Sequence, residues 1–236
     1  MEEFNADMEP EQSVKEDIVN LLKEKSSIKQ AVYDNTFETF STLKDVLHEL
    51  INEINEDVFG SDRRIKIDYR DRGKFEAEAR IAEDILIFSM HSNIFEFDRA
   101  HFIRKTSYIQ KNQCNSYCGI ISIYNFLADS FKYNRINDLG YLIARIFVNH
   151  EKHFFVEGKR QMNSINDFAS QVIDETKIRT ILEKAILYAL RFDLLVPPYD
   201  EVKIATVEQV NTKIENGKLK TGKRLGFQFK SDDILI

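Results

Sequence analysis

Two carboxylates and a lysine have a spacing that could bind a divalent cation. Asp138 precedes the apolar run 141–148, whereas Glu157 and Lys159 follow the apolar run 154–156, and a polar turn separates the runs. If the runs pair as a β-hairpin, Glu157 and Lys159 lie on one face, because side chains alternate along a strand. Carboxylate oxygens bind Mg²⁺. The metal would then activate a water that Lys159 positions.

The order of Asp138, Glu157 and Lys159 resembles the D…ExK pattern of the restriction-endonuclease-like nucleases. The resemblance covers only residues 138–159, and Asn137 stands where that family usually has a proline. It implies a Mg²⁺-dependent nuclease in which all three residues are catalytic and the two acids bind the metal. In the alternative interpretation, Asp138 belongs to a turn, and Glu157 and Lys159 form an ion pair on a solvated face.

Two cysteines and two histidines form a second candidate metal site. Cys114, Cys118, His91 and His101 are of the types that bind zinc, although the histidines flank a different loop from the cysteines. Without a metal, Cys118 would begin a strand as a small apolar residue and Cys114 would be a loop thiol. The sequence leaves both interpretations open. His150 and His153, beside the hairpin turn, are expected to be exposed.

Several enzyme classes lack their motifs in this chain. There is no GxGxxG, GxxxxGK[ST] or GxSxG segment, which argues against kinases, P-loop NTPases, Rossmann dehydrogenases and α/β-hydrolases. We therefore favour a non-catalytic protein that binds a partner or ligand, with no cofactor, over the nuclease and its Mg²⁺. The basic stretch 213–230 could contact nucleic acid, but a solvated hairpin is the preferred interpretation.

Composition and charge indicate a folded chain. Of the 236 residues, 43% are hydrophobic, which is enough for a sizeable core, and the net charge of −6 resides in residues 1–17. We expect an acidic arm over 1–12 and a single domain over 13–236, with a small β lobe at 200–236 as an option. Two cysteines, no signal peptide and no apolar run of about 20 residues predict a cytoplasmic protein without membrane segments.

Three helices follow from periodicity. Ser13 and Glu16 form a capping box before a helix over 13–26, which Ser26 and Ser27 should end. A helix over 29–57 carries a heptad seam that either packs within the chain or forms a homodimer interface. A long helix is expected near 164–192, capped by Ser164 or Asn166. The seam consists of Tyr33, Thr36, Phe40, Leu43, Leu47, Leu50 and Ile54.

The remaining apolar segments are typical of strands: some alternate with polar residues, whereas 117–127 is apolar on both faces, as a central strand is. They predict an α+β fold in which a mainly antiparallel sheet is covered by helices. Residues 128–135 could continue a strand or form a helical turn. The expected strands are 65–70, 75–81, 85–90, 94–97, 117–127, the hairpin 141–156, then 202–207, a hairpin at 214–219 and a last strand at 225–229.

Overall fold

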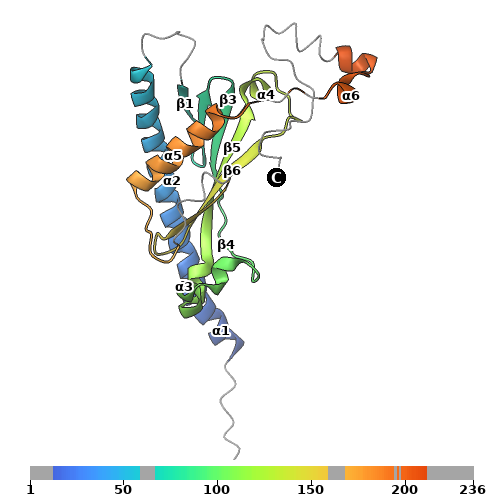
Figure 1. Ribbon diagram of the computed structural model, residues 1–236. Coiled ribbons are helices and arrows are strands. Elements are labelled where there is room, and N and C mark those ends of the chain that lie inside the picture. Colours follow the sequence, from blue (N-terminus) through green and yellow to red (C-terminus); the bar gives the residue numbers. More distant parts are fainter. Residues whose placement is uncertain (1–12, 59–66, 159–167, 194–195, 197, 212–236) are drawn as a thin grey trace, which may run out of the picture.

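The computed structural model describes residues 13–58, 67–158, 168–193, 196 and 198–211. These residues confirm the α+β class: an antiparallel seven-stranded sheet lies beside long helices (Figure 1). None of the helices in this part of the chain is both long and apolar enough to cross a membrane. The acidic arm predicted at 1–12 lies outside the described residues.

The N-terminal helix is continuous over 44 residues. It consists of α1 (Val14–Leu21), a π-helical turn η1 (Leu22–Ser26) and α2 (Ser27–Asp57). The predicted capping box is present, because the Glu16 amide donates to Ser13 Oγ and the Ser13 amide donates to Glu16 Oε2, each at 3.3 Å. The predicted break at Ser26 is wrong. Serine lowers helix propensity only slightly, and extending a helix costs less than starting another.

The strands pair in the order β1-β2-β3-β5-β6-β7, and β4 pairs with the first residues of β5. The predicted hairpin at 141–156 is confirmed as β6 and β7, with its turn at residues 149–152. The strands are β1 (Ile67–Asp71), β2 (Glu76–Ile81), β3 (Asp84–Met90), β4 (Phe95–Glu96), β5 (Tyr117–Leu127), β6 (Tyr141–Val148) and β7 (Phe154–Gly158).

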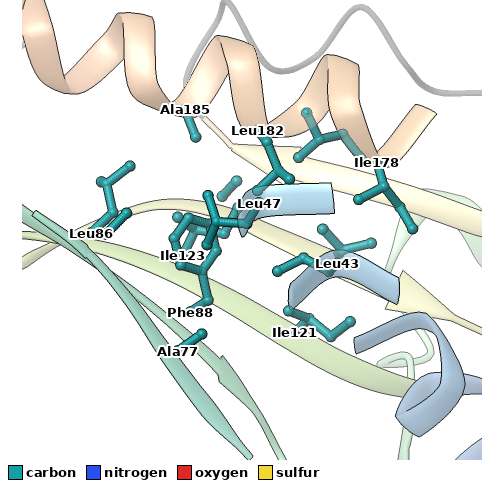
Figure 2. Packing of buried hydrophobic residues seen from close by; sticks show 14 of the residues in the cluster. Leu43, Leu47, Ala77, Leu86, Phe88, Ile121, Ile123, Ile178, Leu182 and Ala185 are labelled. Carbon is teal, nitrogen blue, oxygen red and sulfur yellow. The ribbon is translucent and has the colours of Figure 1, made fainter. Parts of the chain in front are cut away.

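Helices α2 and α5 (Glu175–Leu190) cover one face of this sheet. Figure 2 shows Leu43 and Leu47 of α2 and Leu182 of α5 packed over sheet residues such as Phe88 and Ile123. The α2 seam therefore packs within the chain, which is the first of the two alternatives that the sequence left open. Five of the seven seam residues are buried, namely Thr36, Phe40, Leu43, Leu47 and Leu50, whereas Tyr33 and Ile54 are half-buried against them.

Short elements cover part of the opposite face. They are η2 (Phe102–Lys105), α3 (Ser107–Lys111), η3 (Gln113–Ser116) and, at the other end of β5, the helical turn α4 (Ala128–Lys132). A second apolar cluster forms under the first three, and it contains Phe97, Ile103, Ile109, Cys118, Phe147, Phe155 and Phe168. α4 continues directly from β5 and begins the segment that forms the pocket described below.

The helix expected near 164–192 begins later than predicted. Asp174 caps α5, since its Oδ1 accepts from the Lys177 amide at 2.8 Å, while Ser164 and Asn166 lie outside the described residues. Residues 168–174 are not helical. The Ile173 amide donates to the Lys152 carbonyl at 3.0 Å, and His153 bridges to Val172, so this segment covers the β6–β7 turn. The apolar residues of this segment have the spacing of a helix, but the segment does not form one.

The strand predicted at 202–207 is also wrong. The chain forms a helical turn there, α6 (Tyr199–Val202), and is helical again over residues 207–211. Pro198 stands directly before α6, at a position where its fixed φ suits the start of a helix. The hairpin at 214–219, the strand at 225–229 and the basic stretch 213–230 lie outside the described residues.

Candidate functional site

A pocket of about 320 Å³ opens where β5 ends and before β6 begins. Aromatic and polar side chains share its lining, and Asp138, one of the predicted site residues, is among them. The residues that give the pocket its chemistry are Phe126, Ser130, Phe131, Arg135, Ile136 and Asp138.

Local turns bring these residues together. The Arg135 amide donates to the Ser130 carbonyl at 2.8 Å, and the Asp138 amide donates to the Arg135 carbonyl at 3.1 Å. Asn134 has φ +50°, a left-handed conformation that asparagine tolerates better than most residues. The chain therefore reverses twice within a few residues and places Ser130, Arg135 and Asp138 on one side.

The polar end of the pocket is a three-residue cluster. Asp138 Oδ2 accepts from Ser130 Oγ at 2.6 Å and lies 2.9 Å from Arg135 Nε. The Arg135 side chain is only 11% exposed. Its Nη2 atom is buried and has no hydrogen-bond partner, and its Nε, though ion-paired, lacks hydrogen-bond geometry. A buried donor without an acceptor costs about 1–3 kcal/mol, so Nη2 is a position where a bound acceptor atom would stabilise the protein.

The other end of the pocket is apolar. The rings of Phe126 and Phe131 meet edge to face, with centroids 5.3 Å apart, and the Arg72 guanidinium lies 5.5 Å from the Phe131 centroid. A Cβ on Gly140 would lie 2.2 Å from Phe126 Cε1, so only glycine lets the Phe126 ring take this place. The pocket thus joins an aromatic wall to a paired guanidinium and carboxylate.

The other predicted nuclease residues have different surroundings. Glu157 on β7 accepts from Arg145 Nε on β6 at 2.8 Å, while Lys159 lies outside the described residues. Arg145, the partner of Glu157, lies four residues along β6 from Tyr141, which is about 13 Å. Asp138 precedes Tyr141 and therefore lies beyond the end of β6 that is farther from Arg145. No described contact joins Asp138 to Glu157, and each acid has an arginine partner. The nuclease site stays a prediction.

The four zinc candidates are not gathered into one site. Among the described residues, no group of three or more histidine, cysteine or acidic side chains is placed to hold a metal. Cys118 is buried in β5, and burial raises the pKa of its thiol to about 12. His101 Nδ1 accepts from the Ile103 amide at 3.4 Å and its ring stacks on Phe97. These two residues therefore take part in packing.

The histidines beside the β6–β7 turn are half-buried, so the expectation of exposure is wrong. His153 stacks on Tyr108 with centroids 5.0 Å apart, and its Nδ1 lies 3.1 Å from the Phe168 carbonyl. Asn149, fully buried in the same turn, donates to Tyr108 Oη at 2.8 Å. Burial, followed by the nearby Glu151, raises the pKa of Tyr108. This network fixes the turn.

Sequence reasoning found Asp138 but missed the residues around it. Arg135 was detectable as an opposite charge three residues before Asp138, whereas nothing in the sequence pairs Ser130 or Phe126 with the acid. These contacts depend on the turn at Asn134. Comparisons of the chain with family models, curated proteins and solved structures give no match.

Proposed function

We propose that this protein is a non-catalytic binding protein whose ligand occupies the pocket beside Arg135 and Asp138. Two observations carry the proposal: Arg135 lines an aromatic-walled cavity, and its buried Nη2 has no hydrogen-bond partner among the described residues. A volume of about 320 Å³ lies within the range of small-molecule pockets. The ligand would place an acceptor atom at Nη2 and its apolar body against Phe126 and Phe131.

The charges favour an uncharged ligand. Asp138 already neutralises Arg135 at 2.9 Å, so an anion entering the pocket would meet a carboxylate at close range. A carbonyl or amide oxygen accepts a hydrogen bond without that repulsion. We therefore assign the ligand to the class of small aromatic or aliphatic molecules that carry a carboxamide or other neutral carbonyl group.

The same residues argue against catalysis. The Ser130 hydroxyl donates to Asp138, but a serine nucleophile is normally activated by a base such as histidine or lysine. The residues that line the pocket include neither of these, nor a cysteine, and arginine does not act as a base at neutral pH. The lining thus supports binding and orientation of a ligand without a chemical step.

We also propose that the protein is cytoplasmic, and the cysteines support this location. Cys114 and Cys118 are free thiols, and one of them is buried within β5. Free thiols persist in reducing compartments, which supports the cytoplasm as the location of the protein.

The proposal is tested by titrating the protein with three small probes that share a benzene ring. Benzamide presents a neutral carbonyl oxygen, benzoate presents an anion and toluene presents no acceptor. We expect benzamide to shift the amide resonances of residues 126–138 in ¹H–¹⁵N spectra at lower concentration than either other probe. Shifts that avoid this segment with all three probes, or benzoate binding more tightly than benzamide, would overturn the assignment.

A further inference from the structure

The first turns of the N-terminal helix carry an apolar stripe that nothing described covers. α1 and η1 extend beyond the end of the sheet (Figure 1), and none of their residues is buried. Five large aliphatic side chains lie along them, namely Val14 (76% exposed), Ile18 (53%), Val19 (36%), Leu21 (59%) and Leu22 (60%). Such a concentration of exposed aliphatic residues on one helix is typical of an interaction surface.

The stripe continues the face of α2 that packs on the sheet. Val14, Ile18 and Leu21 are separated by steps of four and three residues in α1, and Ile28 and Val32 are four residues apart in α2, after the π-helical turn η1. Val14, Ile18 and Leu21 are exposed, Ile28 is half-buried and Val32 is fully buried. Lys25 Nζ lies 5.6 Å from the centroid of the Tyr117 ring, at the first residue of β5. The stripe lies beyond Tyr117, where the helix no longer has the sheet beneath it.

We propose that a second copy of this chain covers the stripe, with the two α1 helices paired antiparallel about a two-fold axis. The charges of the segment favour this occupant. Glu16 and Asp17 lie in its first turn beside Lys15, and Lys23 and Lys25 lie in its last beside Glu24, so the first turn is net acidic and the last is net basic. Antiparallel pairing places the acidic end of each helix beside the basic end of the other and opposes their dipoles favourably. The same patch serves both copies, so the assembly closes as a dimer.

The proposed contact is short. Residues 14–26 form about 20 Å of helix, so the pair would bury less surface than a stable obligate dimer needs. We therefore expect a reversible dimer with a dissociation constant in the micromolar range. Self-association through the 29–57 seam, the second alternative offered by the sequence, would instead require α2 to leave the sheet.

Sedimentation equilibrium of the full chain tests the proposal. We expect wild type to shift from monomer to dimer between micromolar and submillimolar concentration. Ile18→Glu and, independently, Leu21→Glu should each raise the dissociation constant by roughly 100-fold, because each places a carboxylate in the contact of both copies. Asn20→Glu adds the same charge away from the stripe and should leave the dissociation constant within about threefold of wild type. A monomeric wild type, or a dimer that both stripe variants retain, overturns the proposal.

The variants are informative because α1 has no buried residue. All of them should keep the wild-type thermal transition of the monomer, so loss of the dimer is separable from loss of the fold. Orientation is tested by charge reversal: Asp17→Lys and Lys23→Glu should each weaken the dimer several-fold, and the double variant should recover most of the loss. Single reversals that change nothing would rule out the antiparallel arrangement.

Discussion

Arg135 illustrates how a charged side chain acquires a binding role from its surroundings. The guanidinium has one ionic partner, Asp138, and two of its buried nitrogens, Nε and Nη2, have no hydrogen-bond acceptor among the described residues. Ser130 completes the contacts of the carboxylate, so Asp138 is held by a hydroxyl and a guanidinium together. This arrangement leaves Arg135 Nη2 as the donor to which an acceptor atom of the ligand would bind.

The nuclease prediction also depends on individual side chains, and a cleavage assay tests it. Glu157 is paired with Arg145, and Asp138 with Arg135. Binding of Mg²⁺ by both acids would compete with both arginine partners, which opposes assembly of the site. We expect that DNA and RNA substrates incubated with Mg²⁺ or Mn²⁺ show no cleavage that is sensitive to Glu157→Ala. Cleavage by wild type that this substitution abolishes would restore the D…ExK interpretation.

A buried acid should make stability depend on pH. Asp84 is 8% exposed, and burial, followed by the charge of Asp193, raises its pKa to about 7. Because the folded pKa exceeds the unfolded value, the stabilising contribution of Asp84 is full below about pH 4. It is lost as the pH rises through about 7, by at most about 4 kcal/mol.

Chemical denaturation at pH 4, 6 and 8 measures this dependence. Asp84→Asn should flatten the decrease in the free energy of unfolding between pH 4 and 8. The control, Asp34→Asn at an exposed position, should leave this decrease unchanged. An Asp84→Asn protein with the wild-type pH profile would show that Asp84 does not titrate in this range.

At the scale of elements, the close crossing of α2 over β5 depends on one glycine. A Cβ on Gly119 would lie 2.1 Å from Thr36 Oγ1, and Thr36 is fully buried with its hydroxyl bonded to the Val32 carbonyl at 2.6 Å. We expect Gly119→Ala to lower the free energy of unfolding by about 1–3 kcal/mol through overpacking.

A double-mutant cycle provides the control for this crossing. Thr36→Ala removes Oγ1 and Cγ2, two of the three atoms nearest to the added methyl group. The double variant should therefore lose less stability than the sum of the single losses, as measured by urea denaturation. Strictly additive losses would mean that the helix and the strand do not meet at these two residues.

Elements with a clear apolar pattern were predictable, and elements defined by tertiary contacts were not. The strands 117–127 and 141–148 follow directly from their apolar patterns. Phe168, Val172 and Ile173 have helical spacing, yet they cover the β6–β7 turn instead. Asp138 was found because it precedes a strand, while its partners depend on a left-handed turn at Asn134 that composition does not specify.

In the whole molecule, the pocket and the α1 stripe lie near opposite ends of β5. Tyr117 begins the strand beside Lys25, and Phe126 at the other end forms the pocket wall. An eleven-residue strand spans about 33 Å, so the two surfaces share no contact. We infer that ligand binding and self-association are energetically independent.

This independence is measurable with one variant at each surface. Ile18→Glu should bind benzamide with wild-type affinity, and Arg135→Lys should dimerise with the wild-type dissociation constant, since neither substitution touches the other surface. Calorimetric titration and sedimentation equilibrium provide the two values. A change of more than about threefold in either would indicate that the surfaces are coupled.

The pocket itself is tested most directly by calorimetric titration of benzamide into three proteins. Arg135→Lys keeps the positive charge beside Asp138 but removes the planar Nη2 donor, whereas Arg145→Lys makes the same exchange at the Glu157 pair outside the pocket. The account predicts roughly tenfold weaker binding for Arg135→Lys, the loss of about one hydrogen bond, and unchanged binding for Arg145→Lys. Equal affinity of wild type and Arg135→Lys would contradict it.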